Sequence, residues 1–101
     1  MQEAFEVVAE PARRALLDAL VAGPRSVGEL VSASGLSQPN TSRHLRILRE
    51  QGFVRATPVG RRRLYELRPE RLAELDRWLT PYRELWRSSL DALEATLDER
   101  K

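Results

Sequence analysis

Two arginines, Arg43 and Arg46, lie three residues apart in the middle of this 101-residue chain, among short polar side chains. On a helix this spacing places both guanidinium groups on one face, together with Pro39 and Glu50 and with Ser42 at its border. Guanidinium groups bind phosphate and the edge of guanine in a planar, bidentate way. Such a face near a helix N-terminus suits the major groove of DNA, and the plainer alternative is a solvated helix face.

The basic charge is concentrated in the same part of the chain. Residues 1–36 hold three arginines against five acidic residues, residues 37–71 hold nine against three, and residues 72–101 hold five basic residues against seven acidic ones. A basic middle between acidic flanks is typical of proteins that bind nucleic acids. A genome of high GC content, which encodes arginine often, would explain the number of arginines, but it would not explain their concentration in one third of the chain.

A helix-turn-helix unit is predicted to position these arginines. Ser26 and Glu29 form a capping box at the start of a short helix that extends to Ala33. Gly35 provides the tight turn that follows, because glycine adopts a positive φ without strain. Ser37 is then expected to cap a second helix, over 38–51, which stops at Gly52.

The second helix also has a face that is predicted to be buried. Thr41, Leu45 and Leu48 share this face, and the Thr41 hydroxyl is expected to bond back within the helix. His44 borders the same face, so packing or a hydrogen bond is one interpretation of this residue and a phosphate contact is the other. A metal site is not expected, because His44 is the only histidine and such sites need three or four ligands.

A basic hairpin is predicted directly after this helix. Residues 53–57 and 63–67 have the composition of two strands, and residues 59–62 form the tip. The arginines Arg61, Arg62 and Arg63 could contact phosphates or an adjacent minor groove, or they could form a solvated tip. Arg63 could also point back toward the body if the second strand begins there.

Helices are predicted on both sides of this basic region. The first covers residues 2–9, with Phe5 and Val8 at helical spacing, and a second runs from Pro11 to Ala22. From Glu70 onward apolar residues recur every three or four positions. Thr80-Pro81 is expected to break or sharply kink this last helix, with Thr80 as a possible new N-cap.

The final piece, over 81–99, carries more apolar surface than so small a domain can cover. Trp86, Leu90, Leu93 and Leu97 form a stripe that is expected to pair with a second copy of the chain. Trp78 and Tyr82, together with Trp86, could instead form an effector pocket or a platform for nucleotide stacking. Aromatic residues at helical spacing are more often part of a core or an interface.

Several classes of protein are excluded by composition. The chain has no cysteine and no run of eighteen apolar residues, which argues against disulfide scaffolds, thiolate metal sites and membrane spans. Residues 1–6 do not have the pattern of a secretion signal. No phosphate-binding loop or nucleophile–base pair is recognisable. We therefore expect a cytoplasmic protein that is not an enzyme, has no catalytic residue and no metal, and needs no cofactor.

Five stretches of the sequence resemble the ArsR family of bacterial winged-helix repressors, and with the tail the resemblance covers nearly the whole chain. The matching stretches are residues 11–17, 26–30, 36–48, 52–54 and 60–67. The tail, residues 78–86, is similar to a branch of that family without metal-sensing cysteines. The resemblance implies a mainly α fold with a small β-hairpin: one winged helix-turn-helix domain over 1–101, with a C-terminal dimerisation helix over about 81–99.

The resemblance also implies a partner, double-stranded DNA, and a homodimer formed through the first and last helices. Such a dimer would act as a repressor on a pseudo-palindromic operator. The residues that match the family's DNA contacts are Ser37, Gln38, Asn40, Ser42, Arg43 and Arg46, with Arg61, Arg62 and Arg63 in the wing. The expected dimer interface consists of Phe5, Val8, Tyr82, Trp86, Leu90, Leu93 and Leu97.

Two departures from the family limit what carries over. Some metal-sensing members have paired cysteines in the helix before the turn, where this chain has Leu30-Val31-Ser32-Ala33. Other members use pairs of Asp and His on the last helix, and the last helix of this chain has no histidine. Metal regulation is therefore not expected. Thr41 occupies a position where the family usually has valine.

Two alternative functions remain open. Winged helices can also bind proteins, but such a surface should expose apolar residues, and Ile47 is the one apolar residue leaning outward beside Ser42, Arg43 and Arg46. The chain could also be a repressor that is released by an unidentified non-metal effector near the last helices.

Overall fold

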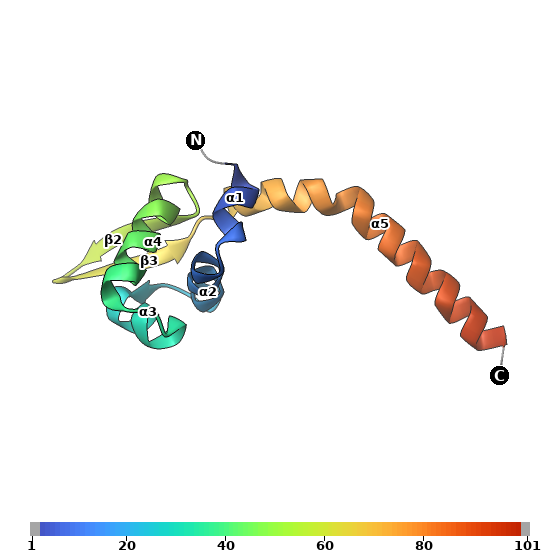
Figure 1. The fold of residues 1–101 in the computed structure, drawn as a ribbon, viewed down its shortest axis with the longest axis horizontal. Helices are drawn as coiled ribbons and strands as arrows, with labels where there is room; N and C mark the ends of the chain where they lie inside the picture. The colour runs from blue at the N-terminus through green and yellow to red at the C-terminus, as the bar shows by residue number, and fades with distance from the viewer. Residues whose placement is uncertain (1–2, 100–101) are drawn as a thin grey trace.

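A computed structural model describes residues 3–99, as five helices and three strands (Figure 1). Gln2, where the first predicted helix begins, lies outside these residues. The helices are α1 (Ala4–Ala9), α2 (Pro11–Leu20), α3 (Val27–Ser34), α4 (Gln38–Glu50) and α5 (Pro69–Glu99). The strands are β1 (Arg25–Ser26), β2 (Val54–Val59) and β3 (Arg62–Leu67).

The predicted hairpin is present, but it is part of a three-stranded antiparallel sheet in the order β1-β3-β2. Val59 pairs with Arg62, so the tip consists of Gly60 and Arg61 and both strands are longer than predicted. Gly60 has a φ of 62°, which such a tight turn requires. The sequence analysis missed β1, because two residues show no alternation of apolar and polar side chains.

The local signals of the helix-turn-helix unit are confirmed. The Glu29 carboxylate accepts hydrogen bonds from the Ser26 backbone N–H (3.1 Å) and hydroxyl (3.0 Å), and the Glu29 N–H donates to Ser26 Oγ. Gly35 ends α3 with a φ of 74°. Ser37 caps α4 by accepting a hydrogen bond from the Asn40 N–H. These caps fix both the start of α4 and the direction in which it leaves the turn.

The core lies where α1 to α4 meet the inner face of the sheet. Its fully buried side chains are Val7, Leu16, Leu20, Leu30, Thr41, Leu45, Leu48, Phe53 and Val54. The three residues predicted to form the buried face of α4 are all among them. Since α4 is anchored along one whole side, its opposite side is held rigidly toward solvent.

Of the break and the sharp kink expected at Thr80-Pro81, the break is wrong, because α5 is one helix of 31 residues with Pro81 inside it. The Thr80 hydroxyl does not cap a new helix; it donates to the Asp76 carbonyl one turn earlier (3.2 Å). Arg83 bridges the same turn by contacting both Asp76 and Thr80. Side chains therefore hold the helix together across the proline, and the helix changes direction partway along its length instead of ending (Figure 1).

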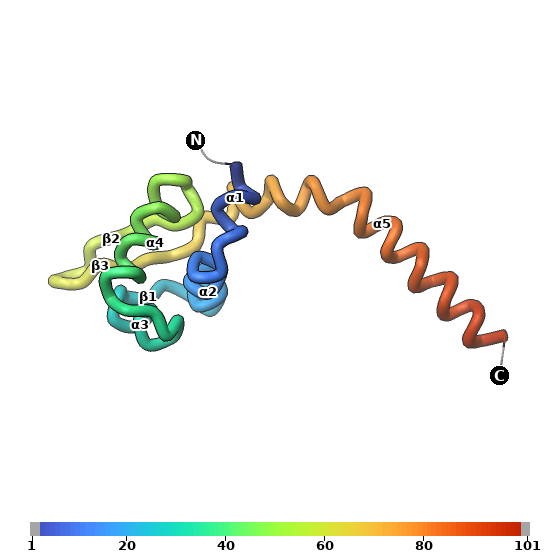
Figure 2. Tube along the Cα trace, in the orientation of Figure 1, coloured from blue at the N-terminus to red at the C-terminus, as the bar shows by residue number. Residues whose placement is uncertain are grey.

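Beyond its first turns, α5 leaves the rest of the protein and extends into solvent (Figure 2). The described chain measures 62 × 31 × 22 Å as a result. No residue within α5 is buried. A helix with an apolar stripe is not stable in this position by itself, because most of the stabilisation of helices in proteins comes from packing.

Candidate nucleic-acid interface

The N-terminal half of α4 presents a continuous polar surface. All six residues that the sequence analysis assigned to DNA contact in this region are exposed. The Arg43 guanidinium lies 3.5 Å from the Asn40 side-chain oxygen. The surface comprises Ser37, Gln38, Asn40, Ser42, Arg43 and Arg46, and we call it the α4 surface. Its exposure and its anchoring from behind are the two properties that a recognition helix needs.

Thr41 lies behind this surface, and the hydrogen bonding of its hydroxyl differs from what the sequence predicted. Its side chain is fully buried, as expected. The expected hydrogen bond back into the helix is absent, however, and among the described residues the Thr41 hydroxyl has no partner. A hydroxyl buried in this way destabilises the fold, since it loses its hydrogen bonds to water and gains none.

Replacing Thr41 with valine should therefore stabilise the protein by about 1 kcal/mol, since valine has the same shape without the hydroxyl. Urea denaturation of the wild type and the variant measures this difference. Thr41→Ser is the matched control, since it keeps the hydroxyl and removes a methyl group, and it should destabilise the protein. A Thr41→Val variant less stable than the wild type would show that the hydroxyl has a partner.

His44 is buried against the core side of α4, with 7% of its surface exposed. Its Nε2 atom lies 3.5 Å from an Arg43 guanidinium nitrogen. Its Nδ1 atom has no partner among the described residues. This position agrees with the packing interpretation. Burial, and then the nearby charges of Arg43 and Arg13, hold the pKa of His44 below its usual range, against a smaller opposite effect of Glu10.

This lowered pKa predicts a pH-dependent stability. Above the unfolded-state pKa of about 6.5, His44 is neutral in both states. As the pH falls below that value, the unfolded chain takes up a proton that the folded protein resists, so the free energy of unfolding decreases down to the folded-state pKa. Urea denaturation between pH 5 and 8 should show this decrease in the wild type. His44→Gln cannot titrate, and equal pH dependence in both proteins would contradict the assignment.

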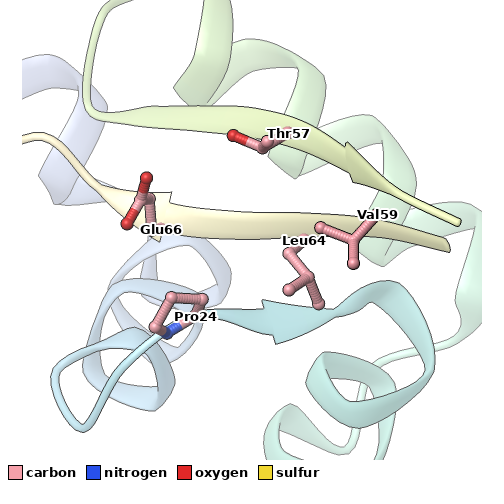
Figure 3. Close-up of a pocket in the computed structure, with 5 residues that line it drawn as sticks. All are labelled: Pro24, Thr57, Val59, Leu64 and Glu66. Carbon is pink, nitrogen blue, oxygen red and sulfur yellow. The ribbon is translucent and has the colours of Figure 1, made fainter.

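The three wing arginines lie in different environments. Arg61 is in the turn, while Arg62 and Arg63 begin β3, and all three are exposed. Side chains alternate between the faces of a strand, so Arg63 shares the inner face with the buried Tyr65. Arg62 shares the outer face with Leu64. The outer face of the sheet also has a hollow of about 180 Å³, lined by Pro24, Thr57, Val59, Leu64 and Glu66 (Figure 3).

Arg62 is also paired within the protein, which sequence reasoning missed. Its guanidinium donates to the Glu29 carboxylate at 2.9 Å. The capping hydrogen bonds from the backbone and hydroxyl of Ser26, followed by the charges of Arg62 and Arg25, hold the pKa of Glu29 below its usual range. Glu29 was recognised as a cap, but no feature of the sequence shows that a residue 33 positions later lies beside it.

The residues assigned to a dimer interface fall into two groups. Tyr82, Trp86, Leu90, Leu93 and Leu97 are about half to two thirds exposed along α5. Phe5 is also exposed, and its ring packs edge-on against Trp78, with ring centroids 5.1 Å apart. Val8 is partly buried against the core of its own protomer. The apolar stripe of α5 is thus exposed in the single chain, and α1 packs against α5 at Trp78.

None of the described helices is long and apolar enough to cross a membrane. Over residues 3–99, no group of three or more histidine, cysteine, aspartate or glutamate side chains could hold a metal ion.

Comparisons with known proteins agree with this geometry. Residues 10–56 match the family model described as bacterial regulatory protein, arsR family. The HTH-type transcriptional regulator Rv2034 of Mycobacterium tuberculosis is 40% identical over 81 residues, which are 76% of each chain. A probable mercury resistance operon repressor of Streptomyces lividans is 37% identical over 71 residues, which are 70% of this chain and 57% of the repressor.

Solved structures extend the match to the fold. A possible transcriptional regulator for arsenical resistance has a TM-score of 0.73 and 36% identity, over 90% of this chain and 97% of the other. The homodimeric winged helix-turn-helix domain Mb0332 of Mycobacterium bovis has a TM-score of 0.65 and 27% identity, over 80% and 75%. The predicted fold class is therefore confirmed, with the addition of a third strand. This chain belongs to the ArsR family of bacterial regulatory proteins.

Proposed function

We propose that this chain is a homodimeric, DNA-binding repressor of transcription that acts in the cytoplasm. The observation that carries the proposal is the α4 surface, where two arginines and four hydrogen-bonding residues are exposed on a helix whose other side is fully buried. A polar helix face held rigidly toward solvent is the arrangement that direct readout of base edges requires. The excess of arginine over residues 37–71 adds attraction to the phosphate backbone.

Each residue of the α4 surface has a role in this proposal. Arg43 and Arg46 bind guanine edges or phosphates in the major groove, because their guanidinium groups are exposed on one face. Asn40 hydrogen-bonds to bases and also holds Arg43 at 3.5 Å. Ser37, Gln38 and Ser42, near the helix N-terminus, bind the phosphate backbone and fix the position of the helix. Arg61 and Arg63 of the wing bind flanking phosphates.

Dimerisation through α5 completes the DNA-binding unit. The apolar stripe of α5 is exposed in the single chain, so a second copy would cover it with an identical stripe. Two symmetric subunits place two copies of α4 in major grooves on one side of the duplex. Their half-sites are then separated by about one helical turn, roughly 34 Å, or a multiple of it.

Selection from a pool of random duplexes tests this proposal without knowledge of the operator. We expect enrichment of an inverted repeat whose half-site centres are about 10 base pairs apart or a multiple of that distance. Failure to enrich any motif, under conditions where the protein is folded and dimeric, would contradict sequence-specific recognition. Enrichment of a single half-site without symmetry would contradict the dimeric arrangement.

A further inference from the structure

We propose that Glu29 is a positioning residue for the wing, which it holds through its ion pair with Arg62, while Arg61 and Arg63 are the wing arginines that contact DNA phosphates. This inference rests on the proposed function and assigns different roles to three adjacent arginines. It removes Arg62 from the DNA contacts that the sequence analysis assigned. It also gives Glu29, otherwise only a helix cap, a part in DNA binding.

The first support is the way in which Glu29 is itself held. One oxygen of its carboxylate, Oε1, accepts hydrogen bonds from the Ser26 backbone, the Ser26 hydroxyl and Arg62, all at 2.9–3.1 Å. Ser26 is buried and pairs with Leu64 of β3. The carboxylate therefore occupies a fixed position at the start of α3, and the arginine that binds it is tied to the body of the protein.

The second support is the direction of the side chains along β3. Arg62 and Leu64 share the outer face, where the hollow of Figure 3 lies. Arg63 belongs to the opposite face, which packs toward the helices, and Arg61 is at the tip. Arg62 and Arg63 therefore point to opposite faces of the wing, and only Arg62 lies on the face from which the Glu29 carboxylate is reached.

The Arg62–Glu29 ion pair also joins the wing to the helix-turn-helix unit, and both bind DNA in the proposed function. Arg62 is the first residue of β3, next to the turn, and Glu29 is in the first turn of α3. The two strands of the wing pair with each other from Val54 to Val59 and from Arg62 to Leu67. A link from a residue beside the wing tip to the helix-turn-helix unit reduces the conformational freedom that the wing would lose on binding DNA.

The alternative role for Arg62, a contact with a DNA phosphate, predicts the opposite change in DNA affinity for one substitution. If Arg62 bound a phosphate, Glu29 would compete for its guanidinium, and Glu29→Gln would strengthen DNA binding. If Glu29 positions the wing, the same substitution weakens binding. Glutamine still accepts the capping hydrogen bond, so Glu29→Gln alters the ion pair and leaves the helix start intact.

The experiment measures the affinity of each variant for a duplex that the wild type binds, at several salt concentrations. Glu29→Gln and Arg62→Ala should each lower the affinity of the dimer about fivefold, since both wings are then less preorganised for DNA, and should leave the salt dependence unchanged. The double variant should be no weaker than either single variant. Arg61→Ala and Arg63→Ala should each reduce the slope of log K against log salt by about 1.8, for two phosphates in the dimer.

Three results would overturn the proposal: tighter binding by Glu29→Gln, a reduced salt slope for Arg62→Ala, or additive losses in the double variant. Thermal denaturation of each variant checks that α3 remains folded, and Arg62 is an exposed residue whose replacement leaves the core untouched. A failure of the proposed function has a different signature, because the wild type would then bind no duplex with sequence preference.

Discussion

Replacing Arg43 with alanine should lower the affinity of the dimer for its operator by about 2–6 kcal/mol. Each bidentate contact between arginine and guanine contributes about 1–3 kcal/mol of discrimination, and a symmetric dimer loses two of them. Arg43 is exposed at the N-terminal half of α4 and is held within reach of Asn40. Arg46→Ala should act in the same direction. Fluorescence anisotropy with the selected duplex and a scrambled duplex measures the loss and shows how much of it is specific.

Arg49→Ala is the matched control for this loss. Arg49 carries the same charge on the same helix and is also exposed, but it lies in the last turn of α4, away from the N-terminal end. Its removal should weaken binding to both duplexes by a similar, small amount, because only long-range attraction to phosphate is lost. Arg43→Ala and Arg49→Ala proteins with equal affinity for the operator would contradict the assignment of Arg43 to base recognition.

Replacing Leu93 with glutamate should convert the protein into a monomer at micromolar concentration. Leu93 is 54% exposed in the single chain, so its remaining apolar surface is available for a second copy. The substitution removes that burial twice and places two uncompensated carboxylates in the interface. The expected weakening of the dimer is at least about a thousandfold. Light scattering should give a mass near 11.6 kDa, that of one chain.

Leu93→Glu tests dimerisation separately from the folding of the protomer. No residue of α5 is buried within the protomer, so Leu93→Glu should leave the stability of the remaining fold unchanged. Ala95→Glu introduces the same side chain on the opposite face of α5 and should remain dimeric. Operator affinity should collapse for Leu93→Glu and persist for Ala95→Glu. A dimeric Leu93→Glu protein would show that the stripe is not the interface.

Much of this fold could be predicted because its decisive signals are local. The Ser26–Glu29 capping box, the positive φ of Gly35 and the cap at Ser37 each depend on residues within four positions of one another, and all three are confirmed. The buried face of α4 follows from helical periodicity in the same way. The wider identification depended on the resemblance of consecutive stretches to a family, which the comparisons confirm.

The features that could not be predicted depend on contacts distant in sequence or on competition between local effects. Strand β1 exists because β3, forty residues later, offers it a partner. The Arg62–Glu29 pair is of the same kind. At Pro81 the sequence left a break and a kink open, and the helix continues because hydrogen bonds from Thr80 and Arg83 hold the neighbouring turn. At Thr41 the expected local bond does not form, because the periodicity that buries the side chain does not supply a partner.

Sequence-specific DNA binding is tested most directly by titrating the protein against labelled DNA from upstream of its own gene, with a scrambled duplex of the same length as control. Anisotropy is read at several salt concentrations. We expect tight binding to the native duplex alone, with an affinity that falls steeply as salt increases, because specific contacts add to release of counterions. Equal and weak binding to both duplexes would contradict it, since electrostatic attraction alone would then explain the interaction.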